Sequence, residues 1–378
     1  MNIPFNRPFL TGNEVPYITK ALEERHLVGN GSFTKECHKW LESHLRIHKA
    51  LLTPSCTAAL EMTALLLDIK PGDEIIMPSF TFVSTANPFV LRGAVPVFVD
   101  IRSDTLNIDE KKIEQAITKK TRAIVVVHYA GIACEMKEIL KISKRHNLFL
   151  IEDAAHGILA RYDDQYLGSF GQVSTLSFHG TKNIVSGEGG AILINDPELL
   201  EKAEVVWEKG TDRSRFFRGL VDKYTWVEMG SSFLVSEVTA AFLLAQLENG
   251  EFINTARLKI WNKYHEAFKS LEDSGFLSRP FVPSECEHNA HLYYIILPTL
   301  EVRTHFIQTM KEKGIGTVFH YIPLHNSPAG LKFGRASGNL KATEDLADRQ
   351  VRLPLWPDLT DYQIQMVIDE VTSFCKKL

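Results

Sequence analysis

The stretch "RAIVVVHYAGIACEMKEILKISKRHNLFLIED", residues 122–153, decides the fold. Its two ends, 122–128 and 148–153, are short runs of β-branched and aliphatic residues that predict buried strands. Between them, residues 134–147 have a helical pattern with acidic residues early and basic residues late, which suits the helix dipole. Two apolar strands joined by a helix predict a parallel pair with a right-handed crossover.

The same alternation continues on both sides of this stretch. Further strands are predicted at 50–53, 74–78, 95–100, 173–178 and 190–195. We therefore expect an α/β fold with a mostly parallel sheet that is flanked by helices on both faces.

A second unit is predicted in the C-terminal third of the chain. A long helical stretch at 251–275 is followed by prolines, a strand at 291–298 and a final helix at 360–378. This pattern predicts a large domain of residues 1–250 and a smaller C-terminal α+β domain of residues 251–378.

The composition excludes several classes of protein. The 378 residues carry a formal net charge of -4, which gives no global reason to expect nucleic acid or an anionic membrane as the main partner. The five cysteines are scattered without metal-ligand spacing, so we expect reduced thiols in a cytoplasmic protein and no metal site. No apolar run approaches the roughly 18 residues that span a bilayer, and we see no export signal.

The segment "TPSCTAAL", residues 53–60, is a candidate phosphate site. A predicted strand ends there and small residues open a helix, whose free backbone amides attract anions. The hydroxyls of Ser55 and Thr57 are within reach of such a group. Simple helix capping by these two residues is the alternative.

The segment "LFLIEDAAHG", residues 148–157, places Glu152, Asp153 and His156 at the end of a buried strand, where ligands of open α/β sheets bind. A carboxylate there could hold a metal, act as a base, or pair with a protonated ring nitrogen of a cofactor. A metal is disfavoured because no second cluster of suitable ligands follows. A helix-capping aspartate is the structural alternative.

Lys182 is the discriminating residue. It lies in "SFHGTKNIVSGEGG", residues 177–190, between two predicted strands, and a desolvated lysine there can form a Schiff base. Most lysines lie on the surface, so the surrounding motifs must decide whether Lys182 is a surface residue or a Schiff-base lysine. A phosphate site, an aromatic residue such as Phe82 that can stack on a ring, a strand-end aspartate and this lysine together satisfy what pyridoxal 5'-phosphate requires.

These motifs, in this order, resemble the DegT/DnrJ-type sugar-nucleotide aminotransferases. The resemblance runs nearly end to end, through "IPFNRPFLTGNE", "LTPSCTAALEM", "IEDAAHG", "SFHGTKN" and "FHYIPLH". It implies the aspartate-aminotransferase-like fold (fold type I) of pyridoxal-phosphate enzymes and a homodimer with the active site at the subunit interface.

The resemblance also assigns roles around the cofactor ring. Lys182 would form the Schiff base with the cofactor and carry the proton between substrate and cofactor. Asp153 would pair with the pyridinium nitrogen. Phe82 would stack on one ring face, and His156 would lie beside the ring and its phenolic oxygen.

At the cofactor phosphate, the resemblance implies the amides of Thr57 and Ala58 and the hydroxyl of Ser177. Many members reach the phosphate of the neighbouring subunit with an Asn in a Gly-Tyr-Asn-Tyr-Arg segment. The matching stretch here is "GSSFLVSE", so Ser232 stands in place of that Asn and Leu234 in place of the Arg. The longer reach of Asn is lost, which puts the cross-subunit contact in doubt.

Two further segments are candidates for substrate binding. The basic, aromatic segment 209–226, with Arg213 and Arg218, could supply the missing positive charge or bind the nucleotide diphosphate, although a solvated loop is the alternative. The segment "FHYIPLH" is interpreted as a wall of the sugar site, formed by His320, Tyr321 and His325; ordinary turn residues are the alternative.

The expected reaction is transfer of an amino group from glutamate to the C4 ketone of TDP-4-oxo-6-deoxy-D-glucose. The product would be TDP-4-amino-4,6-dideoxy-D-galactose, a precursor for surface polysaccharides such as enterobacterial common antigen or O-antigen. Amination at C3, the C4 gluco epimer and a non-catalytic regulatory role are alternatives. Lys182 argues against a dehydratase, because the dehydratases of the family have His there.

Overall fold

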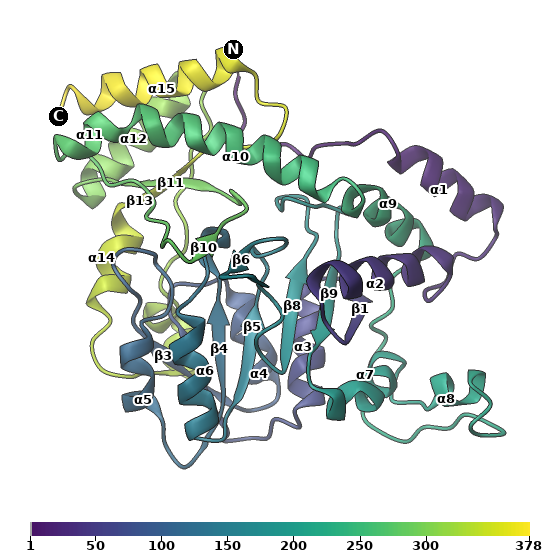
Figure 1. Cartoon of the computed structure of the whole chain (residues 1–378). Coiled ribbons are helices and arrows are strands. Elements are labelled where there is room, and N and C mark those ends of the chain that lie inside the picture. Colours follow the sequence, from purple (N-terminus) through teal and green to yellow (C-terminus); the bar gives the residue numbers. More distant parts are fainter. Residues whose placement is uncertain (1) are drawn as a thin grey trace.

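The computed structural model describes residues 2–378. Its centre is an eight-stranded sheet with the order β1-β9-β8-β5-β4-β2-β3-β12 (Figure 1). The strands are β1 (Lys49–Thr53), β2 (Glu74–Pro78), β3 (Val95–Val99), β4 (Thr121–Val127), β5 (Phe149–Asp153), β8 (Val173–Ser177), β9 (Gly190–Ile194) and β12 (Arg335–Ala336). The seven strands predicted in this region are confirmed, and each end lies within one residue of its prediction.

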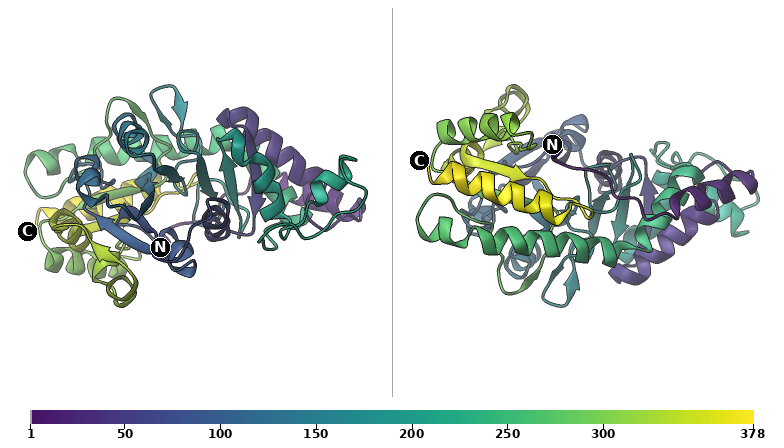
Figure 2. Two further views of the ribbon diagram at one scale, coloured as in Figure 1. Left: turned by 90° about the horizontal axis from the view of Figure 1, so that it is seen from below. Right: turned by 90° about the horizontal axis from the view of Figure 1, so that it is seen from above.

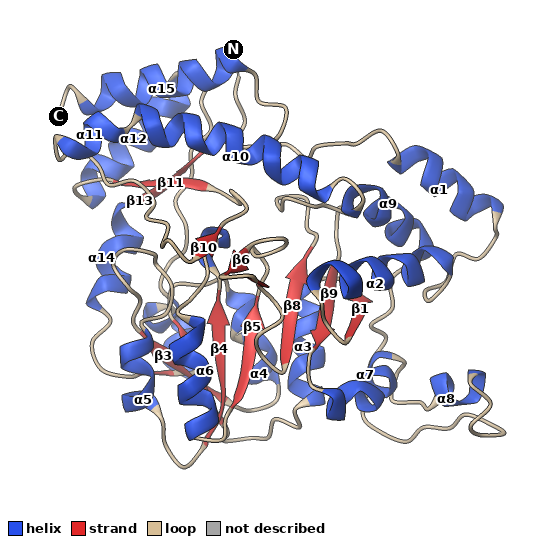
Figure 3. Ribbon diagram, viewed as in Figure 1, coloured by secondary structure: helices blue, strands red, loops and turns tan. Residues whose placement is uncertain are grey.

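The sheet is mostly parallel, as predicted. β12, β3, β2, β4, β5 and β8 pair in parallel, whereas β9 is antiparallel to both β8 and β1. The arrows of β4 and β5 in Figure 3 point toward the C-terminal unit, so the carboxyl ends of the parallel strands face it. Ligands of open α/β sheets bind at that edge.

Both faces of the sheet are buried, which explains the continuous apolar runs. Side chains alternate along a strand, so Ile124 and Val126 of β4 join one hydrophobic cluster while Ala123 and Val125 join the other. The first face is covered by α5 (Ile113–Ala116) and α6 (Met136–Arg145), and the second by α3 (Cys56–Leu66), α4 (Asn87–Leu91) and α7 (Leu200–Trp207).

The start of α3 is held against the sheet by a glycine. A Cβ atom on Gly190 would lie 2.4 Å from the amide nitrogen of Cys56, so only glycine lets β9 pass this close. Ser55 caps the helix, because its hydroxyl accepts a hydrogen bond from the Ala58 amide at 3.0 Å. The amino end of α3 therefore lies at the edge of the sheet where β8 ends and β9 begins.

Near β1, three helices pack together: α1 (Glu14–Glu23), α2 (Ser32–Leu45) and α9 (Glu237–Leu247). A short three-stranded sheet joins β6 (Arg161–Tyr162), β7 (Gln165–Tyr166) and β10 (Cys286–Glu287). Helix α8 (Arg213–Phe217) lies with its loop at one end of the molecule, away from the carboxyl ends of the strands (Figures 1 and 2).

The C-terminal unit has its own hydrophobic cluster. Here β11 (Tyr293–Ile296) pairs with β13 (Gln350–Leu353). The helices of this region are α10 (Gly250–Ala267), α11 (Lys269–Asp273), α12 (Leu300–Glu312), α13 (Pro328–Phe333), α14 (Lys341–Arg349) and α15 (Asp361–Cys375). The helical stretch predicted at 251–275 is thus two helices.

Several segments cross the predicted boundary at residue 250, among them β10, which pairs with β6. Ile3 lies in the hydrophobic cluster of the C-terminal unit and bridges to Ile315, while β12 pairs with β3 of the large sheet. The division into two domains at 250 stays a prediction. Among residues 2–378, no helix is long and apolar enough to cross a membrane.

Candidate active site

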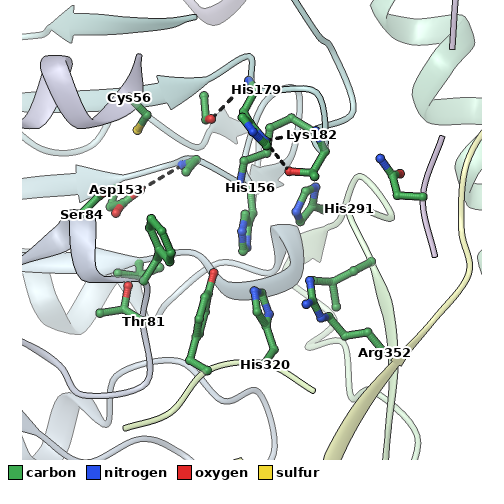
Figure 4. Close-up of a pocket in the computed structure, with 18 of the residues that line it drawn as sticks. Cys56, Thr81, Ser84, Asp153, His156, His179, Lys182, His291, His320 and Arg352 are labelled. Atoms are coloured by element: carbon green, nitrogen blue, oxygen red, sulfur yellow. Dashed lines mark hydrogen bonds between the residues drawn. The ribbon is translucent and has the colours of Figure 1, made fainter. Parts of the chain in front are cut away.

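A cavity of about 720 Å³ lies between the carboxyl edge of the sheet and the C-terminal unit (Figure 4). Its walls come from strand ends and from the start of α3, from the N-terminal residues Phe5 and Asn6, and from the segments 318–321 and 352–355. This volume suits a small-molecule ligand. In the described part of the chain, no cluster of three or more His, Cys, Asp or Glu residues could hold a metal ion.

Lys182 lies in this cavity, in the turn between β8 and β9. The turn is closed by a hydrogen bond from the Lys182 amide to the His179 carbonyl at 2.9 Å. Burial lowers the pKa of the Lys182 amine to about 8. Within residues 2–378, no carboxylate comes within ion-pair distance of its Nζ atom. A substantial fraction of the amine is therefore neutral and nucleophilic near neutral pH.

Asp153 ends β5 and also lines the cavity. Its Oδ2 accepts a hydrogen bond from the Thr85 hydroxyl at 2.7 Å and its Oδ1 one from the Ala155 amide at 3.2 Å. Burial raises the pKa of this carboxyl. The carboxylate is thus fixed in position and has no direct cationic partner among residues 2–378, which is the environment that attracts a protonated ring nitrogen.

The neighbouring carboxylate, Glu152, has a different role. It is fully buried and accepts hydrogen bonds from the amides of Gly168 and Gly171, both at 2.8 Å, and from His128 Nε2 at 2.9 Å. All of these partners belong to the protein framework. Of the two carboxylates at this strand end, Asp153 is therefore the one that remains a candidate for contact with a cofactor.

The start of α3 offers two free amides, although not the predicted pair. The Ala58 amide donates to the Ser55 hydroxyl, and Ala58 does not line the cavity. Within residues 2–378, the amides of Cys56 and Thr57 have no acceptor. Ser177, at the end of β8, faces the same space. The Ala58 amide is thus used by the helix cap, whereas the Cys56 amide is free beside the cavity, and the assignment of Ala58 to a phosphate stays a prediction.

Phe82 and His156, predicted to stack on the cofactor ring and to lie beside its phenolic oxygen, both line the cavity. The Phe82 side chain is 57% exposed although it lies in the cavity wall, so its ring has a free face. His156 is buried, and its Nδ1 atom has no hydrogen-bond partner. An unpaired buried polar atom is costly, so a ligand oxygen beside it would satisfy it.

His291 is a cavity residue that the sequence did not reveal. Its ring stacks on the ring of His156 with centroids 4.0 Å apart, and its Nδ1 lies 2.9 Å from Asn183 Oδ1. The Asn183 amide cannot turn round, because its Nδ2 donates to Asn254 Oδ1 at 2.9 Å and to the Asn289 carbonyl at 2.8 Å. His291 Nδ1 must therefore be the protonated nitrogen, which leaves Nε2 as an acceptor.

His320 and Tyr321 also reach the cavity. His320 Nδ1 lies 3.0 Å from the Tyr129 hydroxyl, and the rings of His320 and Tyr321 are 3.6 Å apart. Burial lowers the pKa values of His156, His291 and His320 well below the ordinary histidine value. These imidazoles form a polar but uncharged wall.

The remaining predicted residues are not brought to the cavity. His325 lies outside it, where its Nδ1 contacts the Ser79 hydroxyl at 2.7 Å and its Nε2 contacts Glu344 at 3.1 Å. Arg213 and Arg218 lie at α8, where they pair with Glu208 and Glu204.

Ser232 is exposed on the strand-like segment beside Glu208. Like the two α8 arginines, it does not line the cavity of its own chain. His179 lies at the rim, where its Nδ1 is 2.9 Å from the Thr181 hydroxyl.

Comparisons with known proteins bear on this site. A sequence model described as the DegT/DnrJ/EryC1/StrS aminotransferase family matches residues 9–372. Among curated proteins, the chain is 33% identical to spore coat polysaccharide biosynthesis protein SpsC of Bacillus subtilis, over 99% of this chain and 97% of that one. It is 30% identical to GDP-perosamine synthase of Escherichia coli O157:H7, over 98% of each.

Among solved structures, Spr1654 of Streptococcus pneumoniae in its PMP form superimposes with a TM-score of 0.91 at 27% identity, over 100% of this chain and 98% of that chain. This similarity covers both the sheet and the C-terminal unit, so the fold on both sides of the cavity is shared.

Proposed function

The chain belongs to the DegT/DnrJ/EryC1/StrS aminotransferase family, and we propose that it transfers an amino group from glutamate to the C4 ketone of TDP-4-oxo-6-deoxy-D-glucose. The product of this reaction is TDP-4-amino-4,6-dideoxy-D-galactose, a precursor for surface polysaccharide. The names of two relatives support the pathway class, since one concerns a spore coat polysaccharide and the other a GDP-linked amino sugar.

The enzyme is a sugar aminotransferase and its cofactor is pyridoxal 5'-phosphate. The residues fit this group: free amides at Cys56 and Thr57 for the phosphate, the unpaired Nδ1 of His156 for a ring oxygen, and the Asp153 carboxylate for the ring nitrogen. When bound, the cofactor supplies an electron-withdrawing ring and a carbon that carries the amino group from donor to acceptor.

Lys182 carries the proton transfers. Because burial lowers its pKa to about 8, it can take a proton from the donor carbon as a neutral amine and return a proton as an ammonium ion. Asp153 keeps the ring nitrogen protonated, since a buried carboxylate stabilises a cation beside it. The observation that carries the proposal is this lysine in one cavity with the uncompensated Asp153 and the free amides of α3.

His320, Tyr321 and His291 are proposed to contact the sugar. Their donors and acceptors are uncharged, which suits hydroxyl groups on a pyranose ring, and they form the wall opposite the sheet.

The proposal includes a homodimer in which the α8 segment reaches the site of the partner subunit. The guanidinium carbon of Arg213 lies 5.2 Å from the ring of Phe217, and Phe217 and Trp226 of this segment are 67% and 78% exposed. This basic, aromatic surface does not line the cavity of its own chain. It is suited to bind the diphosphate of a nucleotide that lies in the cavity of the partner subunit. The proposed location is the cytoplasm, which the five free cysteines support.

The test is incubation with glutamate and TDP-4-oxo-6-deoxy-D-glucose, followed by NMR spectroscopy of the product at C4. We expect the galacto amine, with 2-oxoglutarate formed in equal amount. Formation of the gluco epimer, or faster amination of a 3-oxo sugar nucleotide, would replace the proposed substrate and product. A visible absorption band that does not change on adding glutamate would exclude amino transfer from this donor.

A further inference from the structure

One short turn after β2 adjoins three different parts of the proposed cofactor site. The turn is closed by a hydrogen bond from the Thr85 amide to the Phe82 carbonyl at 3.1 Å. Phe82 lies in the cavity wall, and the hydroxyl of Ser84 is 2.7 Å from that of Thr57, at the start of α3. The hydroxyl of Thr85, the next residue, donates to Asp153. The turn therefore connects the groups proposed for the ring face, the phosphate and the ring nitrogen.

Thr85 differs from Phe82 and Ser84 because it does not line the cavity. Its side chain is fully buried, so it cannot touch a ligand itself. Its Oγ1 lies 2.7 Å from Asp153 Oδ2 and also 2.7 Å from Thr81 Oγ1. Thr81 does line the cavity, and Figure 4 shows it on the same side as Asp153. Three side chains thus form one chain of hydrogen bonds that ends at the carboxylate.

This chain of hydrogen bonds has one direction. An ionised carboxylate only accepts hydrogen bonds, so the hydrogen of the Thr85 hydroxyl must lie toward Asp153. The contact between the two threonines then uses the hydrogen of the Thr81 hydroxyl, which has no other partner within residues 2–378. A hydroxyl that accepts a hydrogen bond becomes a stronger donor, so Thr81 strengthens the bond from Thr85 to the carboxylate.

These bonds favour the ionised form of Asp153. Burial raises the pKa of this carboxyl, and the bond from Thr85 is the largest of the influences that lower it, ahead of the Ala155 amide and the charge of Lys182. The other titratable groups around the carboxyl are His128, Cys56 and Tyr321. Without the Thr85 hydroxyl, the carboxyl would therefore hold a proton more readily.

Thr175 is a second buried threonine beside Asp153, but it lacks this contact. It pairs in register with Asp153 across β5 and β8, and its side chain is also fully buried. Its hydroxyl contacts the thiol of Cys56 at 3.5 Å and not the carboxylate. Both threonines are thus neighbours of Asp153, and only Thr85 is bonded to the oxygen atoms that are proposed to face the cofactor.

We propose that Thr85 is a positioning residue that keeps the Asp153 carboxylate ionised and aimed at the ring nitrogen of the cofactor, with support from Thr81. This inference deepens the proposed role of Asp153 and rests on it. Thr85 holds Oδ2 and the Ala155 amide holds Oδ1, so the carboxylate cannot rotate and its free lone pairs keep one direction. If the bond from Thr85 were lost, the proton between the carboxylate and the ring nitrogen would shift toward the carboxylate.

The first experiment titrates Asp153 in the cofactor-free protein by carbon-13 NMR spectroscopy of labelled aspartate carboxyl groups, with Asp153→Asn to identify the signal. Thr85→Val keeps the shape of the side chain but removes the hydroxyl. It should raise the midpoint by about one to two pH units, because the charged form loses a hydrogen bond. Thr85→Ser restores a hydroxyl and should return the midpoint most of the way to that of the wild type.

Thr175→Val is the matched control, because it makes the same substitution at a buried residue beside Asp153. It should leave the midpoint unchanged. Thr81→Val keeps every direct contact of Asp153 and should raise the midpoint by only about 0.2 to 0.5 pH units, since it removes the cooperative part alone. If Thr85→Val does not fold, as judged by circular dichroism, Thr81→Val carries the test, and an unchanged midpoint would then overturn the inference.

The second experiment records the nitrogen-15 NMR signal of bound cofactor that is labelled at the ring nitrogen. Asp153→Asn should give the signal of an unprotonated ring, and Thr85→Val should move the signal part of the way from the wild type toward it. A loss of thermal stability in Thr85→Val with an unchanged titration and an unchanged signal would show a purely structural role and overturn the inference.

The Asp153→Asn signal separates this inference from the proposal on which it rests. A shift in Asp153→Asn without any shift in Thr85→Val would overturn the role of Thr85 and leave that of Asp153 intact. A signal that is the same in Asp153→Asn and in the wild type would refute the pairing of Asp153 with the ring nitrogen, and the inference with it. Neither measurement requires turnover or a sugar substrate.

Discussion

The two walls of the cavity differ in how their charge is arranged. The sheet wall, with Lys182, Asp153 and the start of α3, carries an amine, a carboxylate and free amides at the ends of secondary-structure elements. The wall from the C-terminal unit carries the neutral imidazoles of His291 and His320 and the guanidinium groups of Arg257 and Arg352, neither of which pairs with a carboxylate within residues 2–378.

This difference separates two tasks. The groups of the sheet wall suit the cofactor and the proton transfers that every substrate needs, whereas the opposite wall suits recognition of one substrate or another. Changes in the sheet wall should therefore affect both halves of the reaction, and changes in the opposite wall should affect only one.

The largest expected effect comes from Lys182→Ala. The variant loses both the nucleophile that captures the cofactor and the group that moves protons, so turnover should fall by about 10⁴-fold. Product formation measured by NMR spectroscopy with glutamate and the 4-oxo sugar nucleotide checks this. A variant that retained a tenth of the wild-type rate would remove Lys182 from its central role.

The second effect is that of Asp153→Asn. The amide cannot stabilise a protonated ring nitrogen, and losing one partner of a buried ionic pair costs about 3–5 kcal/mol, so both half-reactions should slow by about 10²- to 10³-fold. Rapid-mixing absorbance measurements test each half separately. An effect confined to the sugar half would contradict the separation of tasks.

Glu152→Gln is the control for that variant. Glu152 accepts hydrogen bonds from the protein framework only, among them those of the Gly168 amide and His128. We expect its replacement to lower the midpoint of thermal unfolding, because buried donors lose an ionised acceptor. The half-reaction rates of the folded fraction should stay close to those of the wild type.

The third effect is a pH dependence. With a Lys182 pKa of about 8, the neutral amine makes up about half of the population at pH 8 and about one hundredth at pH 6. Capture of added pyridoxal phosphate by the cofactor-free protein should therefore be about 50-fold slower at pH 6 than at pH 8. Between pH 8 and pH 10 the rate should then rise only about twofold, whereas an amine with the ordinary lysine pKa would give a rise of about 70-fold. Stopped-flow absorbance gives the rates, and the larger rise would show that the lysine pKa is not lowered.

A smaller effect is expected in the opposite wall. His320→Ala removes one uncharged hydrogen-bonding group. The half-saturation concentration for the sugar nucleotide should therefore rise about 5- to 10-fold, while that for glutamate changes little. Half-saturation concentrations for the two substrates provide the comparison. An equal rise in the half-saturation concentration for glutamate would instead show that His320 serves both half-reactions.

The smallest effect is that of His325→Gln. His325 lies outside the cavity and contacts Ser79 and Glu344, contacts that a glutamine can partly replace. We expect both half-reactions to stay within about twofold of wild type. A selective loss of sugar affinity in steady-state kinetics would restore the interpretation of His325 as part of the sugar wall.

The sheet wall could be predicted from the sequence because its groups follow strand ends directly. Asp153 and Lys182 stand next to apolar runs whose length and position define the strands, and parallel strands bring their ends together. The role of Ala58 at the phosphate stays a prediction: its amide donates to the Ser55 hydroxyl, and a cap and an anion site have the same sequence pattern.

The opposite wall could not be predicted in the same way. His291 lies two residues before β11 and Arg352 lies on its partner strand β13, whereas Phe5 reaches the cavity from the other end of the chain. No local pattern in the sequence records which side chains such distant segments bring together. The protonation of the His291 ring depends on Asn183, whose amide is oriented by Asn254 and the Asn289 carbonyl, and residues 183, 254 and 289 come together only in the folded protein.

The most direct test of the central claim is a two-step titration of the purified, cofactor-loaded enzyme followed by visible absorbance. We predict that glutamate bleaches the band of the bound cofactor, and that TDP-4-oxo-6-deoxy-D-glucose, added after glutamate is removed, restores it with one amino sugar formed per site. A band that glutamate does not bleach, or one that bleaches but is not restored by the sugar nucleotide, would contradict this account.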